Sequence, residues 1–189
     1  MAATLGADLR ALRKSRAMTL EELAQTMARS VGWLSQVERG VSKPNMSDLQ
    51  RLAGIFGVPM SLFFGTADAP ENERGRIVRG GARRAIGERE GGLVEELLSP
   101  DLTDAFEVLH STFLPGAGRT EAIRRPTQEL AYLVCGKLDI WLGNEGGGSE
   151  EGFVVKAGDA FRIRGTTFRW TNPYPDPAVA IWIISPPVY

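Results

Sequence analysis

Apolar residues recur every three to four positions in the first third of the chain, which is the spacing of helices with one buried face. Leu5, Leu9 and Leu12 line one side of a first helix that ends near Met18, and basic residues fall on its other side. The same spacing continues through residues 1–66. We therefore expect a small bundle of five helices in this part of the chain.

Polar residues at the ends of these apolar stretches are typical helix caps. Thr19 and Glu22 form a capping-box pair at the start of the second helix. Ser30 is suited to cap a third helix and Gly40 to end it, so the second and third helices are joined by a tight turn. The remaining limits are Asn45 or Ser47 and Gly57 for the fourth helix, and Pro59 for the start of a short fifth turn.

After residue 66 the period of the pattern changes. Residues 67–73 are polar, include a proline and show no apolar periodicity, which is typical of a linker. From residue 74 to residue 189, short apolar or alternating runs such as AFEVLHSTFL and KLDIWLG are separated by clusters of Gly, Pro, Asn and Asp. These runs predict an all-β sandwich or barrel over residues 74–189.

Charge divides the chain at the same place. Residues 1–66 hold eight Lys and Arg against five acids, a net charge of +3, and the remainder holds 14 against 18, a net charge of −4. Opposite charges in the two parts suggest two domains with different partners, the basic one a candidate for phosphate contacts.

Composition excludes several classes of protein. No apolar run approaches the roughly 18 residues that a membrane-spanning helix needs, and the N-terminus lacks the apolar centre of a signal peptide. We therefore expect no membrane partner and a cytoplasmic location. Cys135 is the single cysteine, so the chain can form neither an internal disulfide nor a Cys-rich zinc site.

The N-terminal helices carry a known pattern. The segment TLEELAQTMARSVGWLSQVERGVSKPN fits T-x-x-x-L-A followed by S-x-x-x-L-S-x-x-E-x-G, and a later Val-Pro turn also fits. It resembles the lambda-repressor-like (XRE) helix-turn-helix regulators over about 60 residues, and this resemblance implies binding to double-stranded DNA. One departure is Ala28-Arg29, where the family usually has Gly followed by an apolar residue. Because Ala tolerates a left-handed conformation poorly, we expect a reshaped turn there.

The resemblance implies that the N-terminal end of the third helix faces base edges in the major groove. Gly32 then lets the backbone sit close to the duplex, Val31 can meet a thymine methyl, and Gln36 can bind adenine through two hydrogen bonds. Residues better placed for phosphates are Ser30, Ser35, Arg39 and Lys43. Residues expected on the inner side are Trp33, Leu34 and Val37 in the core, and Glu38 as a structural ion-pair partner.

Two stretches of the second part resemble the cupin motifs. PGAGRTEAIRRPTQELAYLVCG carries the Pro-Gly and Glu129 of the first motif, and AGDAFRIRGTTFRWTN carries the Gly-Asp, Gly165 and Asn172 of the second. The resemblance implies a double-stranded β-helix, or jelly-roll, barrel. A helix-turn-helix followed by a cupin looks like a bacterial regulator whose barrel senses a small molecule and helps dimerisation.

The residues that bind metal in cupins are mostly replaced here. The four matching positions hold Ala122, Arg124, Glu129 and Phe168, so only the glutamate remains. The chain has one histidine, His110, which we expect to be structural, and one histidine cannot complete a three-His site or a two-His-one-carboxylate site. We therefore expect a barrel without metal or other cofactor.

The vacant metal position suggests an effector pocket. By the motif and the alternation of side chains along a strand, Ala122, Arg124, Glu129, Phe168 and Trp170 are expected to point into the barrel. Two interpretations stay open. Arg124 pairs with Glu129 and fills the cavity, or Arg124 holds a carboxylate or phosphate ligand against the two aromatic rings.

These patterns favour a transcriptional regulator over the alternative class, a cupin enzyme such as a dioxygenase or isomerase with an accessory DNA-binding domain. The loss of metal ligands argues against the enzyme, and a lone histidine leaves no Ser-His-Asp or Cys-His arrangement. We expect no enzymatic activity. Since one helix-turn-helix gives limited affinity, we also expect a homodimer. The C-terminal runs AVAIWII and PPVY are a candidate interface, with the barrel core as the alternative place for them.

Overall fold

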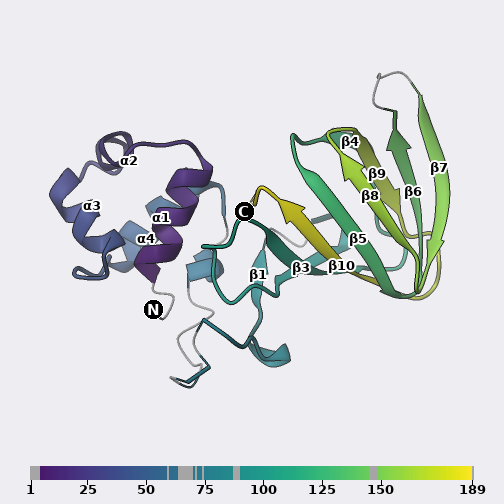
Figure 1. Ribbon diagram of the computed structural model, residues 1–189, viewed down its shortest axis with the longest axis horizontal. Coiled ribbons are helices and arrows are strands. Elements are labelled where there is room, and N and C mark those ends of the chain that lie inside the picture. The colour runs from purple at the N-terminus through teal and green to yellow at the C-terminus, as the bar shows by residue number, and fades with distance from the viewer. Residues whose placement is uncertain are drawn as a thin grey trace. The chain divides into compact units, whose positions relative to one another are not determined.

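The computed structural model describes residues 5–58, 60–63, 70, 72–73, 75–86, 90–144 and 149–188 (Figure 1). The chain divides into two compact units. The first comprises Met1–Ile86 and Leu98–Asp104, and the second comprises Gly87–Leu97 and Ala105–Val188. Most of the predicted linker, residues 67–73, lies outside the described residues.

The first unit is helical, as predicted. Its elements are α1 (Leu5–Ser15), α2 (Leu20–Thr26), α3 (Val31–Glu38), α4 (Met46–Phe56), the 3-10 helices η1 (Met60–Phe63) and η2 (Gly80–Ala82), and the short strand β1 (Arg84–Ile86). Within the described residues, the predicted fifth helix is the four-residue 3-10 turn η1.

The helix limits follow from the caps that the sequence offers. At α2 the Thr19 side chain accepts from the Glu22 backbone at 3.1 Å, and the Glu22 carboxylate accepts from the Thr19 backbone at 2.7 Å. Asn45, and not Ser47, caps α4 in a second capping box. Gly57 ends α4 with a φ of 66°, which glycine adopts without strain.

One apolar core holds these helices together. The residues that are at most 1% exposed include Leu9, Leu12, Leu23, Met27, Leu34, Leu52, Phe56 and Leu62. They are the positions that recur every three to four residues in the sequence. Within the part of the chain that the structure describes, no helix has the length and apolar character to cross a membrane.

The second unit is built of antiparallel strands. They are β2 (Leu93–Leu97), β3 (Glu107–Phe113), β4 (Gly118–Arg124), β5 (Gln128–Cys135), β6 (Lys137–Gly143), β7 (Glu150–Lys156), β8 (Ala160–Arg164), β9 (Thr167–Thr171) and β10 (Ala178–Ser185), preceded by the 3-10 turn η3 (Glu90–Gly92). Within this unit one sheet has the order β2-β3-β10-β5-β8, and the other has the order β4-β9-β6-β7 (Figure 1).

The chain passes repeatedly from one sheet to the other, which is the winding of a jelly-roll barrel. The predicted fold class, a helical bundle followed by an all-β barrel, is confirmed. The motif residues have structural roles: Gly158 and Gly165 take φ values of 93° and 59°, and the buried Asn172 amide donates to Phe113 O and Asp176 O.

Candidate nucleic-acid interface and ligand cavity

The limits of α3 are set by residues just outside it. The Ser30 hydroxyl accepts from the backbone N–H of Trp33 at 3.1 Å, which satisfies a free donor of the first turn. Gly40, after the C-terminal residue Arg39, takes a φ of 72° and turns the chain away. α3 therefore has a fixed N-terminal end, the end expected to face base edges.

Fewer residues of α3 are buried in the core than the sequence suggests. Leu34 and Val37 are buried, as predicted. Trp33 is not a core residue but half-buried, and the Arg29 guanidinium lies over its ring, with the guanidinium carbon 5.0 Å from the ring centroid. A cation over an indole is favourable, so Arg29 covers a ring that the small bundle does not enclose.

The structure leaves most of the predicted DNA-contacting residues exposed. Exposed are Ser30, Val31, Gly32, Gln36, Arg39 and Lys43, and Ser35 is half-buried. They lie on α3 or directly beside its two ends. Contact with DNA stays a prediction for each of them.

Gly32 is not required by the protein's own packing. A Cβ built on Gly32 would meet nothing within 4 Å, and its backbone is ordinary helix. Gly6 of α1 is the opposite case, because a Cβ there would overlap the backbone carbonyl of Val37. The lack of a side chain at Gly6 thus serves the contact between α1 and α3, whereas Gly32 leaves open space beside an exposed helix end.

The Gln36 side chain is held in place by the residues after α3. Its Oε1 accepts from the Ser42 hydroxyl at 2.9 Å. An amide oxygen has two lone pairs, so this bond leaves one of them, and the amide nitrogen, for an adenine edge.

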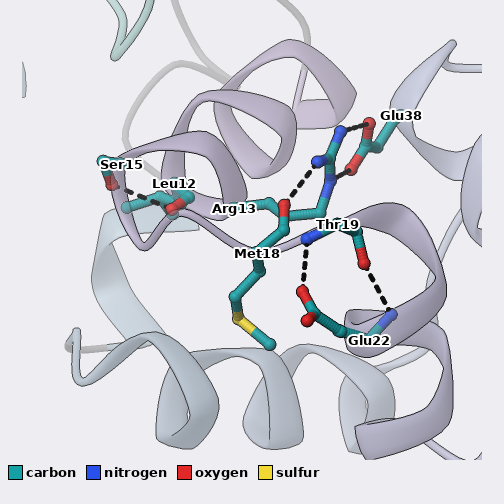
Figure 2. Close-up of polar contacts among 7 residues, drawn as sticks. All are labelled: Leu12, Arg13, Ser15, Met18, Thr19, Glu22 and Glu38. Atoms are coloured by element: carbon teal, nitrogen blue, oxygen red, sulfur yellow. Dashed lines mark hydrogen bonds and ion pairs between the residues drawn. The ribbon is translucent and has the colours of Figure 1, made fainter.

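An ion pair anchors the C-terminal end of α3 (Figure 2). The Arg13 guanidinium of α1 forms two parallel bonds to the Glu38 carboxylate, at 2.6 and 3.0 Å, and donates a third to Met18 O at 2.8 Å. The hydrogen bond to Glu38 raises the pKa of Arg13 above its ordinary value. The prediction that Glu38 is a structural ion-pair partner is confirmed.

The turn between α2 and α3 is not reshaped, contrary to our expectation. Ala28 takes a φ of 49°, the left-handed conformation that the family assigns to glycine. Arg29, in the place of an apolar residue, donates to Asp48 of α4 at 2.8 Å. Hydrogen bonds from Ala28 N to Gln25 O and from Arg29 N to Ala24 O close the turn, so the chain accepts the strain at Ala28.

The second unit contains an inner cavity of about 70 Å³. Its apolar lining is Leu93, Phe113, Ile123, Phe168, Trp170, Trp182 and Ile184, and its polar lining is Glu95, Arg119, Arg125 and Glu129. An outer hollow of about 660 Å³ adjoins it. The two share Leu93, Glu95, Arg119, Ile123 and Trp170, so they adjoin along these residues.

Four of the five predicted pocket residues border this space. Glu129, Phe168 and Trp170 line the inner cavity, and Ala122 lines the outer hollow. Arg124 borders neither, and the expected inward orientation is wrong for Arg124 and also for Ala122, two positions away on the same face of β4. The Arg124 Nε donates to Gly165 O at 2.6 Å on the exposed side of the barrel.

The pairing of β4 with β9 explains the outward position of Arg124. Arg119 lies opposite Trp170 and Ile123 lies opposite Phe168, with a shift of register between these two pairs. Paired residues of antiparallel strands face the same side, so Arg119 and Ile123 share the inner face with the two aromatic rings. Arg124 follows Ile123 directly and therefore turns outward.

The interpretation in which Arg124 pairs with Glu129 is therefore wrong. The buried Glu129 carboxylate accepts from the Thr127 hydroxyl at 2.7 Å and from the Trp182 indole N–H at 2.8 Å. Both oxygens of Glu129 are thus occupied by neutral donors.

The residues present offer no metal site of the usual kind. Among the described residues, no group of three or more His, Cys, Asp and Glu could hold a metal ion. His110 lies on β3, half-buried, with Nδ1 3.7 Å from the Glu96 carboxylate. It lines neither the cavity nor the hollow.

Comparison with known proteins agrees with the geometry of the first unit. Residues 4–62 match the family model described as "Helix-turn-helix domain". This segment is similar to helix-turn-helix domains. An HTH-type transcriptional regulator of Mycobacterium tuberculosis is 33% identical over 91 residues, which cover 47% of this chain and 36% of that protein. The immunity repressor protein of Bacillus phage phi105 is 34% identical over 62 residues, covering 33% of this chain and 43% of the repressor.

The chain thus spans less than half the length of these curated relatives. Among solved structures, the chain is similar to an RmlC-like cupin from Shewanella frigidimarina. The identity is 19%, the alignment covers 59% of this chain and 91% of that chain, and the TM-score is 0.47.

Sequence reasoning missed residues in both units. Val41, which follows α3, and Met46, the first residue of α4, are exposed apolar residues that the pattern of buried positions did not single out. Glu95, Arg119 and Arg125 were missed in the barrel. The spacing of Arg119, Ile123 and Arg125 by even numbers was a signal that they share one face, but the motif assigned the opposite face to the interior.

Proposed function

We propose that the chain is a sequence-specific transcriptional regulator that binds double-stranded DNA through α3 and binds a small-molecule effector in its barrel. The observation that carries the proposal is the exposed N-terminal end of α3, where Gly32 leaves space that the fold itself does not use. The names of the two relatives, a transcriptional regulator and a repressor, support it over the matched segment. Such a regulator would act in the cytoplasm.

The test of DNA binding is a gel shift against genomic fragments with a titration of salt. Each Lys or Arg that neutralises a phosphate steepens the fall of the logarithm of the binding constant with the logarithm of the salt concentration. Lys43→Ala should therefore make this slope shallower by about one unit. Lys14→Ala removes the same charge from the exposed side of α1 and is the matched control, which should leave the slope unchanged. Binding that no genomic fragment improves over random DNA would refute the proposal.

We further propose that the regulator is a homodimer. The larger sheet has an exposed apolar outer face with Leu130, Tyr132 and Val134 on β5 and Ile183 on β10. In the pairing of β5 with β10, Leu130 lies opposite Ile183, so these side chains form one continuous patch. The inner residues of the AVAIWII run, such as Trp182, belong to the barrel core instead.

A charge in this patch should separate the copies. Tyr132→Asp should turn a dimer into a monomer by light scattering and weaken DNA binding, because two half-sites are no longer bound together. Val154→Asp, at an exposed position of β7 in the other sheet, is the control and should leave the dimer intact. A wild-type chain that is monomeric at micromolar concentration would contradict the proposal.

The alternative class, a cupin enzyme, has less support. The chain has a single histidine, and His110 lies apart from the cavity. The cupin-motif positions other than Glu129 hold residues that do not bind metal, and both Glu129 oxygens already accept hydrogen bonds. We therefore propose a binding role for the barrel, not a catalytic one.

A further inference from the structure

Two arginines, the exposed Arg119 and the half-buried Arg125, line the inner cavity without a partner among the described residues. Neither Arg119 nor Arg125 forms a hydrogen bond or ion pair with any residue that the structure describes, although each lies near enough to influence Glu95 electrostatically. A guanidinium carries five N–H donors in a planar fork that suits a carboxylate or phosphate. Two such groups on one partly enclosed space point to an anionic ligand.

The two carboxylates of the cavity do not satisfy these arginines. Glu129 already accepts from Thr127 and Trp182. Among the described residues, Glu95 accepts only from the Ser111 hydroxyl, at 3.3 Å. Burial raises the pKa of the Glu95 carboxyl against the opposing influence of Arg125 and Arg119. Neither guanidinium group is therefore held by a short contact with a carboxylate of the cavity.

The remaining walls are apolar. The rings of Phe113 and Trp170 meet edge to face with their centroids 4.7 Å apart, and the ring centroids of Phe168 and Trp182 are 5.3 Å apart. The inner cavity, of about 70 Å³, is much smaller than the adjoining hollow of about 660 Å³. A ligand must therefore place a small head group inside and extend its body into the outer hollow.

We propose that the barrel binds a small organic monocarboxylate, with its carboxylate between Arg119 and Arg125 and its apolar body along Leu93, Ile123 and Trp170. A phosphate dianion is disfavoured because Glu95 shares the space and would repel it. This inference rests on the proposed function only in treating the cavity as the effector site. It transfers to Arg119 and Arg125 the role that the sequence suggests for Arg124.

The test is a titration of the full chain with acetate, hexanoate, benzoate and phenylacetate, and with benzamide and inorganic phosphate as comparison ligands. Binding is followed by the indole N–H signals of the four tryptophans in a two-dimensional NMR spectrum. We expect at least one carboxylate to shift the signals of Trp170 and Trp182 and to leave those of Trp33 and Trp141 unchanged. Benzamide and phosphate should bind at least tenfold more weakly.

Three variants locate the carboxylate. Arg119→Gln and Arg125→Gln should each weaken binding by about tenfold or more, because each removes a charge-assisted hydrogen bond. Arg124→Gln, one residue away but facing outward, should change binding by less than twofold. Unperturbed spectra of the variants without ligand verify that each one folds.

The inference is overturned if no carboxylate shifts Trp170 and Trp182, if benzamide or phosphate binds as well as the carboxylates, or if Arg124→Gln has the largest effect. Its failure is distinguishable from failure of the regulator function. Carboxylate binding without any retention of DNA in the gel shift would support the ligand site and refute the regulator, and DNA binding without carboxylate binding would do the reverse.

Discussion

Asp8 and Arg84 form a buried ion pair within the first unit, with Oδ2 and Nη1 2.8 Å apart and side chains only 5% and 3% exposed. Hydrogen bonds complete it. Arg84 also donates to Leu62 O at 3.1 Å and to Pro100 O at 3.3 Å, and the other oxygen of Asp8 accepts from Leu102 N at 3.0 Å. The pair therefore ties α1 to η1, to β1 and to the connection between β2 and β3.

Breaking this pair should destabilise the first unit strongly. Asp8→Asn leaves the Arg84 charge buried without a counter-charge, which costs about 3–5 kcal/mol in proteins. The loss should be measured by urea unfolding followed through helical circular dichroism. Arg79→Gln breaks the ion pair with Glu73, whose arginine side chain is 66% exposed, and should cost less than about 1 kcal/mol. Equal losses in the two variants would contradict a stabilising role for the buried pair.

Such long-range pairs mark the limit of what the sequence predicts. The caps of α2, α3 and α4 follow from residues three positions apart, so the pattern around Thr19, Ser30 and Asn45 was sufficient to place them. Asp8 and Arg84 are 76 residues apart. No local preference brings them together, because their contact depends on the packing of the whole unit.

Gly32→Ala should increase stability and weaken DNA binding. The substitution should raise the free energy of unfolding by about 0.5–1 kcal/mol, because alanine is the better helix residue and its Cβ meets nothing within 4 Å. The same methyl should weaken DNA binding at least tenfold in the gel shift, because it fills the space next to the duplex.

Gly54→Ala is the matched control for this prediction. Gly54 is an exposed glycine inside α4, and a Cβ there also meets nothing within 4 Å. The variant should gain similar stability and bind DNA like the wild type. Unchanged DNA binding in Gly32→Ala would show that α3 does not approach the duplex with this end.

The barrel cavity illustrates a second limit of sequence reasoning. Phe168 and Trp170 were placed correctly because β9 alternates these buried aromatic residues with more polar ones. In β4 the two apolar residues, Ala122 and Ile123, are adjacent and so point to opposite faces. The alternation of β4 therefore shows which residues share a face but not which face is inward, and only the pairing with β9 decides it.

Ala28→Gly should stabilise the helix-turn-helix domain. The left-handed conformation costs alanine roughly 1–2 kcal/mol in the folded state. Glycine removes this cost but lowers the free energy of unfolding by about 0.4–1 kcal/mol, because it gives the unfolded chain more conformational freedom. A net gain of about 0.5–1 kcal/mol is expected in urea unfolding. Ala11→Gly, inside α1, should have the opposite sign and cost about 1 kcal/mol. A loss of stability in Ala28→Gly would show that the turn is not strained.

Glu107 makes the stability of the barrel depend on pH. It is 1% exposed, its Oε1 accepts from Val188 N at 3.1 Å, and its Oε2 has no partner among the described residues. Burial, together with the charges of Glu95 and Glu129, raises the pKa of its carboxyl from 4.5 to about 7, against the hydrogen bond from Val188 and the charge of Arg125. Between these two values the folded protein binds more protons than the unfolded chain, so stability falls as pH rises through this window.

Glu107→Gln should remove this dependence. A difference of about 2.5 pKa units corresponds to roughly 3 kcal/mol in the free energy of unfolding. The wild type loses this amount in full above pH 7, whereas Glu107→Gln, whose amide does not ionise, keeps it. Urea unfolding followed by tryptophan fluorescence should therefore show similar stability for the two proteins near pH 4.5 and a more stable variant above pH 7. Burial also raises the pKa of the Glu95 carboxyl, so a shallower slope of the same sign remains in the variant. Glu121→Gln, at an exposed position of β4, should reproduce the wild-type profile, and a Glu107→Gln profile parallel to the wild type would refute the assignment.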